Sequence, residues 1–237
     1  RENFSQIKEE ALLAINSLNV DEIRALEKIA YSLGLEEQIL IGHASSSLVE
    51  EIEKLNIGRN ILVVAGKGNN GADVLSSARK LLSRGYSVKS VIVADTHLKR
   101  EVCFQKNILE KINSFICVID KNNINILKKL LQEADCVIDG LLGIGINKEV
   151  CGVIKDVIKM INSFAKKVIA CDIPSGLEPN EGKILGEAIR ADFTITFIAP
   201  KEGFFLGKGR KFCGKIIVKD IGVSKEILER YIEEMIW

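Results

Sequence analysis

The sequence is short of several features that would place it in a special class of protein. Only 3 of its 237 residues are proline, only 5% are aromatic, and no apolar run approaches the roughly 20 residues that span a bilayer. An excess of one charge is also missing, because 33 basic residues balance 32 acidic ones and leave a net charge of +1. We therefore expect neither membrane insertion nor strong attraction for nucleic acid, and the ordinary charged fraction of 27% excludes a disordered chain.

The cysteines lack the spacing of a metal site. Six are present, but none forms a Cys-x-x-Cys pair, and no histidine lies near any of them at zinc-site spacing. Four sit in apolar runs such as SFICVID and VIACDIP. We therefore expect buried, reduced thiols and a cytoplasmic protein, and no secretory leader is visible in the sequence.

The first part of the chain has a helical pattern. Residues 1–56 carry apolar residues three and four positions apart, and Asn19 is an expected N-cap with Glu22 three residues later. Gly34 is an expected helix end. The segment EEQILIGHASSSLVEEIEKL then predicts a third helix, with a Gly-His-Ala-Ser break in its middle.

From residue 60 onward, short β-branched runs alternate with amphipathic helices. Strands are expected within 60–66, 86–95, 115–120, 134–145, 166–176, 191–200 and 214–222. Helices are expected at 70–85, 97–113, 122–133, 149–164 and 224–236. This alternation predicts a three-layer, Rossmann-like α/β fold, with a mostly parallel sheet, helices on both faces and a helical N-terminal extension. We expect a single domain over 1–237, with a lead-in at 1–56, a core at 57–237 and a strand order of 3-2-1-4-5-6.

Three polar, glycine-bearing loops follow strands that this order places side by side. They are GKGNNGAD (66–73), DGLLGIGINKE (139–149) and DIPSG (172–176). Open parallel sheets bind ligands outside the carboxyl ends of their strands, where the strand order reverses. We therefore expect the three loops to converge on one crevice, which is the strongest indication of function that the residues give.

The first loop is nearly a dinucleotide fingerprint. Its three glycines spell G-x-G-x-x-G between a strand and a helix, and Asp95 ends the second strand. However, Asp73 in the first helical turn would repel a phosphate, and the double Asn at 69–70 suits hydroxyls, amides or a cation better. The alternative is that the glycines only shape a tight turn and that Asp73 only caps the helix.

The other two loops bring carboxylates. Asp139 and Asp172 end adjacent strands, about 5 Å apart in the sheet direction. Two close carboxylates either share a proton, which raises one pKa, or bind a cation. Lys148 is either a phosphate ligand or a solvated helix residue, and Lys201 either touches the ligand or only caps the rim. We expect His43 to be a packing residue.

Four segments, VVAGKGNNGAD, ADCVIDGLLGIG, ACDIPSGLE and TFIAPKEG, together resemble the YjeF N-terminal domain family, the NAD(P)HX epimerases. The stretch at 21–52 resembles that family's helical lead-in. The resemblance implies a Rossmann-like isomerase that interconverts the R and S forms of hydrated NADH or NADPH, as a repair of damaged nicotinamide cofactor. It also implies coupling to a dehydratase that accepts only the S form, which bifunctional members carry as a C-terminal domain.

The resemblance further implies roles for individual residues. Potassium is implied on Asn70, Asp139 and Ser175, and Asp139 is the first candidate for the catalytic acid/base, followed by Asp172. Substrate contacts carry over to the loops after the first, fourth and fifth strands: Asn69, Asn70, Gly71, Ala72, Asp73, Gly143, Ile144, Gly145, Ile146, Asn147, Lys148, Glu149 and Asp172.

This chain departs from the family pattern at three places. The usual N-N-G-G-D-G has Ala72 and Val74 at its two later glycines, and Lys148 replaces a common arginine. Two alternatives to an epimerase therefore stay open. One is a non-catalytic nucleotide-binding or scaffold member of the family, and the other is an NAD-dependent dehydrogenase. We also expect a homodimer, because a sheet layer covers only part of the apolar faces of the lead-in.

Overall fold

The central sheet has the expected parallel topology. The structure, a computed structural model, describes residues 2–94 and 97–236. All strand pairs of the sheet are parallel, in the order β3-β2-β1-β4-β5-β6-β7. The strands are β1 (Asn60–Ala65), β2 (Ser87–Val93), β3 (Phe115–Ile119), β4 (Cys136–Gly140), β5 (Val168–Cys171), β6 (Phe193–Phe197) and β7 (Lys215–Lys219). The predicted fold class and strand order are confirmed.

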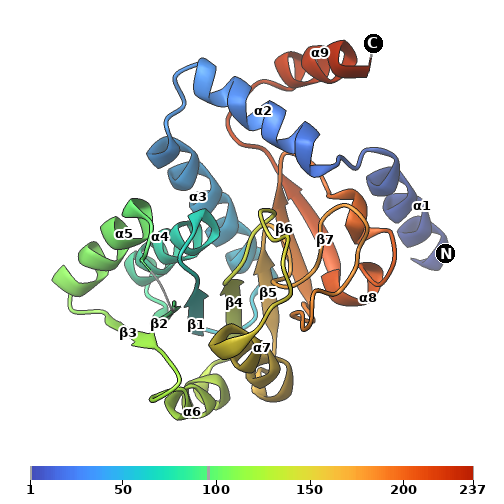
Figure 1. Cartoon of the computed structure of the whole chain (residues 1–237). Helices are drawn as coiled ribbons and strands as arrows, with labels where there is room; N and C mark the ends of the chain where they lie inside the picture. Colours follow the sequence, from blue (N-terminus) through green and yellow to red (C-terminus); the bar gives the residue numbers. More distant parts are fainter. Residues whose placement is uncertain (1, 95–96, 237) are drawn as a thin grey trace.

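Helices cover both faces of this sheet (Figure 1). One face carries α3 (Glu37–Leu55), α4 (Asn69–Ser83) and α5 (Arg100–Lys111), and the other carries α6 (Asn125–Glu133) and α7 (Gly152–Phe164). Each layer encloses its own aliphatic core against the sheet. The central strands are buried on both faces, which is why they appear in the sequence as continuous apolar runs. Two elements too short to predict, η1 (Glu202–Phe204) and α8 (Arg210–Cys213), follow β6.

The lead-in consists of α1 (Glu2–Ile15), α2 (Val20–Ser32) and α3. The capping box between Asn19 and Glu22 is present, and Gly34 adopts a φ of +88° after α2, both as predicted. The predicted break in the third helix is wrong, because α3 continues through 42–45. Its small residues let α4 approach closely there: the buried hydroxyls of Ser45 and Ser76 lie 2.9 Å apart in a hydrogen bond.

The lead-in is attached to the far end of the chain by backbone bonds. Leu18 forms an isolated parallel bridge with Lys201: its N–H donates to the Pro200 carbonyl at 2.9 Å, and its own carbonyl accepts from the Glu202 N–H at 3.1 Å. As a result, α2 lies across the carboxyl ends of the strands, beside the C-terminal α9 (Lys225–Ile236) (Figure 1). The lead-in is therefore placed where ligands of such sheets bind.

Two further expectations concern the thiols and membranes. All six cysteines are free, and three are buried as expected, but Cys151 is exposed at the start of α7. In the part of the chain that the structure describes, every helix is too short or too polar to cross a bilayer.

Candidate active site

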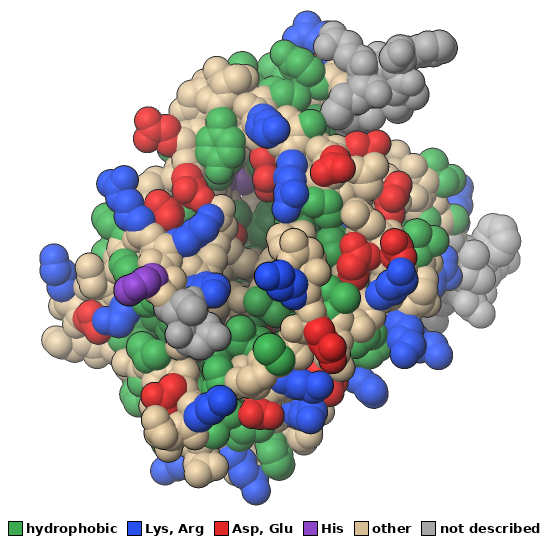
Figure 2. All heavy atoms as spheres, in the orientation of Figure 1, with side chains coloured by type: hydrophobic (Ala, Val, Ile, Leu, Met, Phe, Trp, Pro, Cys, Tyr) green, Lys and Arg blue, Asp and Glu red, His purple; other side chains and the backbone are tan. Residues whose placement is uncertain are grey.

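A cavity of about 470 Å³ opens above the carboxyl ends of the central strands. Figure 2 shows the molecule hollowed on this face, with acidic and basic side chains around the opening. Its wall comes from two sources, the loops after the strands and the lead-in helices α2 and α3. Its size suits one small organic ligand or one half of a dinucleotide.

The three predicted loops do meet at this cavity, although not with all their residues. Seven of the predicted residues line it: Asn69, Asn70, Asp73, Gly143, Ile144, Gly145 and Asp172. Gly71 and Ala72 are buried beneath the first loop, and Ile146, Asn147, Lys148 and Glu149 lie outside the cavity wall. The four residues after Gly145 miss the cavity because the loop turns away from it and back toward the surface, where three of them are exposed.

The glycines of the first loop have two different roles: two allow close backbone packing, and one leaves the backbone accessible to a ligand. A Cβ at Gly66 would lie 1.8 Å from the Leu141 carbonyl oxygen, and one at Gly71 would lie 2.0 Å from the Gly66 carbonyl oxygen. A Cβ at Gly68 would meet nothing within 4 Å, and Gly68 lines the cavity. Two glycines therefore hold strand, loop and helix together, while the middle one leaves backbone open to a ligand.

Asp73 is not a helix cap. The prediction that it lies in the first helical turn is wrong, because α4 already begins at Asn69 with Gly68 as its N-cap. Its half-buried side chain lines the cavity instead. Asp95, the acidic residue of the dinucleotide alternative, lies outside the described residues. The two substituted glycine positions, Ala72 and Val74, are fully buried in the core and do not face the cavity.

Asp139 is held in a closed hydrogen-bond network behind the cavity wall. One carboxylate oxygen accepts from the Ser175 hydroxyl at 2.6 Å and from the Leu141 N–H at 3.1 Å, and the other accepts from the Ser175 N–H at 2.9 Å. Burial raises the pKa of Asp139 to about 6, although the hydrogen bonds from Ser175 and Leu141 act to lower it. Asp139 is fully buried and is not among the described residues that line the cavity.

Asn70 connects this network to the cavity. Its side-chain amide donates to the carbonyls of Leu142 and Cys171, both at 2.9 Å, while its Oδ1 is buried without a hydrogen-bond partner among the described residues. The Leu142 carbonyl also accepts from Ser175 at 3.3 Å. The amide nitrogen of Asn70 and the hydroxyl of Ser175 therefore meet at the Leu142 carbonyl, and the buried Oδ1 of Asn70 is left unsatisfied among the described residues.

Asp172 faces the cavity and is fixed from one side. It adopts a left-handed φ of +64°, which is strained for a residue other than glycine. Its Oδ1 accepts from the Thr196 hydroxyl and the Phe197 N–H, both at 3.1 Å, and pairs closely with the ammonium group of Lys201. Lys201 lines the cavity and is fully buried. Asp139 and Asp172, which were expected to act as a carboxylate pair, hydrogen-bond to separate partners, Ser175 for the first and Thr196 for the second.

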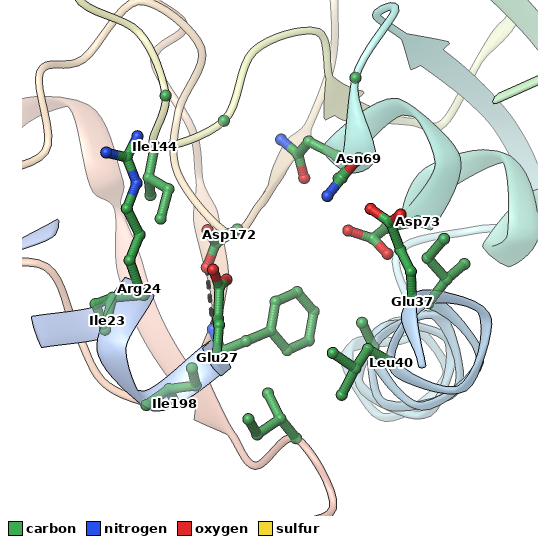
Figure 3. Close-up of a pocket in the computed structure, with 18 of the residues that line it drawn as sticks. Ile23, Arg24, Glu27, Glu37, Leu40, Asn69, Asp73, Ile144, Asp172 and Ile198 are labelled. Carbon is green, nitrogen blue, oxygen red and sulfur yellow. Dashed lines mark hydrogen bonds between the residues drawn. The ribbon is translucent and has the colours of Figure 1, made fainter. Parts of the chain in front are cut away.

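The second wall was missed by the sequence reasoning. On α2, Arg24, Glu27 and Tyr31 line the cavity, and Glu37 does so from α3 (Figure 3). The three α2 residues follow one another at three- and four-residue spacing, directly beside the buried apolar stripe of the same helix. That polar stripe was the available sequence signal, but any exposed helix face has the same pattern.

Four carboxyl groups and three basic side chains line the cavity in the described part of the chain. Burial raises the pKa of Glu27, and the negative charge of Asp172 raises it further. Burial also raises the pKa of Asp73 well above its usual range, with added contributions from Asp172, Glu27 and Glu37. The histidines take no part: His43 pairs with Asp220 at 2.7 Å and His97 is exposed, and neither lines the cavity. The cavity therefore holds carboxyls with raised pKa values, which favours a role in proton transfer.

The sheet, the three loops and the cavity together define a Rossmann-like α/β protein with a ligand site at the switch point of its sheet. The yeast protein YNL200c shares this fold. Its crystal structure superimposes with a TM-score of 0.79, covering 91% of this chain and 93% of that one at 16% identity.

Sequence comparison then gives the family. The model for the YjeF-related protein N-terminus matches residues 37–203, and the chain belongs to this family. The NAD(P)H-hydrate epimerase of Elusimicrobium minutum is 33% identical over 91% of this chain and 100% of its own length. The bifunctional NAD(P)H-hydrate repair enzyme Nnr of Thermofilum pendens is 34% identical over 89% of this chain. The chain spans about two fifths (41%) of the length of that bifunctional relative.

Proposed function

We propose that the protein is an NAD(P)H-hydrate epimerase, an isomerase that interconverts the R and S forms of hydrated NADH and NADPH. The observation that carries the proposal is the cavity above the strand ends, where Asn69 and Asp73 of α4 and Asp172 after β5 face one space of about 470 Å³. Relatives that bear this name match 91% and 86% of the chain. The cavity fits the nicotinamide half of such a substrate and offers amide and carboxyl groups to it.

The two predicted catalytic aspartates take different parts in this proposal. Asp172 lines the cavity, so its free Oδ2 can contact the substrate directly. Asp139 acts through Ser175, whose hydroxyl and N–H it fixes, and so it positions the loop that carries Asp172. The geometry therefore favours Asp172 over Asp139 for direct contact with the reacting ring.

We also propose that potassium binds where Asn70, Asp139 and Ser175 meet. The proposal is supported by the Oδ1 of Asn70, which is buried without a partner among the described residues, and by the carboxylate and hydroxyl oxygens of the Asp139–Ser175 pair, since potassium binds protein oxygens in place of water. A bound ion would supply positive charge beside Asp139. The carboxylate, amide and hydroxyl would hold it in the protein.

A coupled assay tests the activity. The protein is incubated with R-NADHX and a dehydratase specific for the S form, and NADH recovery is compared with spontaneous epimerisation. We expect acceleration by the wild type and a loss of about 100-fold or more in Asp172→Asn, because an acid/base contact contributes about 10²–10⁴-fold. Nucleotide binding without acceleration would support a non-catalytic family member instead. Oxidation of a hydroxy acid with NAD would support the dehydrogenase.

The cation is tested by exchange. Thermal unfolding is measured in potassium chloride and in tetramethylammonium chloride at equal ionic strength. We expect potassium to raise the melting temperature of the wild type, because an ion that binds only the folded state stabilises it. The same comparison in Asn70→Ala should show no difference between the salts. If potassium raised the melting temperature of both proteins equally, the assignment of Asn70 as a potassium ligand would be wrong.

The partner expectations extend the proposal. We propose a homodimer, supported by Leu12 and Ile15 on α1, which are 61% and 80% exposed. A monomer in sedimentation at micromolar concentration would contradict it. We also propose functional coupling to an NAD(P)HX dehydratase, since curated relatives of this chain include bifunctional repair enzymes. The free thiols fit a reducing cytoplasm.

A further inference from the structure

The carboxyl groups of the cavity differ in how they are held. Asp172 accepts three hydrogen bonds on one oxygen, whereas no described residue hydrogen-bonds to the side-chain carboxyls of Glu27 and Asp73. Glu27 belongs to α2 of the lead-in and Asp73 to α4 of the core. A carboxyl without fixed partners can give up or take a proton without breaking existing bonds. Glu27 and Asp73 can therefore exchange protons with a ligand, as can Glu37, which lines the same cavity.

Glu27 and Asp73 lie on different walls of the cavity. In Figure 3, Glu27 points toward Asp172, Asp73 lies with Glu37, and open space separates the two pairs. The charges of Asp172 and Glu27 nevertheless act on Asp73 more strongly than the charge of Glu37 does. Each pair joins two acidic groups from different elements. Burial and the charges of neighbouring carboxyls raise the pKa values of Glu27 and Asp73, so each side of the cavity holds a carboxyl that keeps its proton more readily than an exposed one.

The surroundings of Glu27 set its protonation. Burial raises the pKa of Glu27 most, the charges of Asp172 and, less strongly, Glu37 raise it further, and Lys201 and Arg24 act to lower it. On α4, Asp73 faces the same space. Tyr31, one turn further along α2, has its own pKa raised by burial first and then by the charges of acidic neighbours that include Glu27.

The chemistry of the proposed substrate needs a group on each side. Water added to an enamine places the hydroxyl on the carbon bonded to the ring nitrogen. When an acid protonates this hydroxyl, the carbon–oxygen bond breaks, water leaves, and the nitrogen electron pair forms a carbon–nitrogen double bond. Water then adds to the opposite face and gives a proton to a carboxylate there. One water leaves and one adds, one proton is donated and one is taken, and nothing is oxidised. In the reverse direction the two carboxyls exchange roles.

We propose that Glu27 is a catalytic acid/base of this site, acting from the α2 side of the cavity, opposite Asp73. This inference rests on the proposed epimerase function and adds to it a reacting group from the lead-in. It assigns the lead-in a chemical part in the reaction in addition to covering the sheet.

The test is the coupled assay with Glu27→Gln, which keeps the shape of the side chain and removes its proton exchange. We expect kcat to fall about 100-fold or more, KM for R-NADHX to stay within about threefold, and the pH profile of kcat to lose one limb. Asp21→Asn is the matched control, because Asp21 is exposed on the same helix and does not line the cavity. It should leave rate and profile unchanged.

A second variant distinguishes the loss of proton exchange from a loss of folding. Glu27→Asp keeps a carboxyl on a shorter side chain, so it should keep the pH limb that Glu27→Gln loses, at a reduced kcat. A Glu27→Gln enzyme with the wild-type kcat and pH profile overturns the inference, as does one in which only KM rises. If the wild type itself gives no acceleration, it is the proposed function that has failed.

Discussion

The two walls of the cavity differ in how completely their polar groups are used. Behind the wall formed by the strand-end loops, Asp139 pairs with Ser175 and Asn70 donates to backbone carbonyls, so that among these three side chains only Asn70 Oδ1 lacks a partner in the described part of the chain. On the lead-in wall, Glu27 and Glu37 face the cavity without hydrogen bonds from described residues. The difference separates two tasks: the network behind the core wall holds a fixed shape, while Glu27 and Glu37 of the lead-in, together with Asp73 of α4, supply carboxyls that can change their protonation.

The largest effect expected from this comparison lies in the core wall. Gly71→Ala places a Cβ 2.0 Å from the Gly66 carbonyl oxygen, which the backbone cannot accommodate without moving. We expect a loss of roughly 3 kcal/mol or more in the free energy of unfolding, measured by urea denaturation. Gly68→Ala is the matched control, since its Cβ meets nothing within 4 Å. Stability there should change by less than about 0.5 kcal/mol while ligand binding weakens. If Gly71→Ala and Gly68→Ala were equally stable, the packing role assigned to Gly71 would be wrong.

A smaller effect is expected where the lead-in docks. The Asn180 side-chain oxygen accepts from the Val20 N–H at 2.9 Å, at the start of α2. Asn180→Ala leaves this donor unpaired, so we expect a loss of about 1 kcal/mol. Hydrogen exchange should speed up in α2 and stay unchanged in β1 and β4. Uniform acceleration across the sheet would mean that the two walls unfold as one unit and that the distinction between them is not energetic.

The smallest effect concerns the ion pairs that fix α3. Burial acts to raise the pKa of Glu51, but hydrogen bonds from Lys219 and Lys54 outweigh it and the pKa is lowered. A lowered carboxyl pKa stabilises the fold above its ordinary value of 4.5, and this contribution is lost as the pH falls through the folded value. Glu51→Gln should therefore cost up to about 1 kcal/mol at pH 7 and progressively less in acid.

Glu53→Gln is the control for this variant, because Glu53 lies on the same helix and its pair with Arg84 is more exposed. Denaturation curves at pH 7 and pH 4 should show a smaller loss than in Glu51→Gln. A cost for Glu51→Gln that does not change with pH would contradict the ion-pair account.

The same contrast explains what the sequence could predict. The parallel sheet, its order and the meeting of the three loops follow from strand periodicity and from the geometry of right-handed crossovers. The second wall does not, because Glu27 and Arg24 reach the cavity only through the docking of α2 by the bridge between Leu18 and Lys201. Local sequence patterns carry no information on a contact between residues as far apart in the chain as Leu18 and Lys201.

Short-range expectations failed where packing decided the outcome. The Gly-His-Ala-Ser segment was expected to break a helix by its propensity, but the close approach of α4 at Ser45 keeps it helical. We expected a carboxylate pair of Asp139 and Asp172 because their strands are adjacent. In the structure Asp139 accepts a hydrogen bond from Ser175, whereas Asp172 pairs with Lys201. Strand register determines where each strand ends, but it does not determine the orientation of the side chain that follows.

The bridge between Leu18 and Lys201 also bears on how the protein is made. During synthesis the lead-in emerges from the ribosome first, but the segment that holds it in place is translated more than 180 residues later. At about 5–20 residues per second, α2 waits roughly ten seconds or longer for its partner. The binding cavity is therefore completed late in translation, and a chain stalled before β6 would display a nascent sheet without a functional pocket.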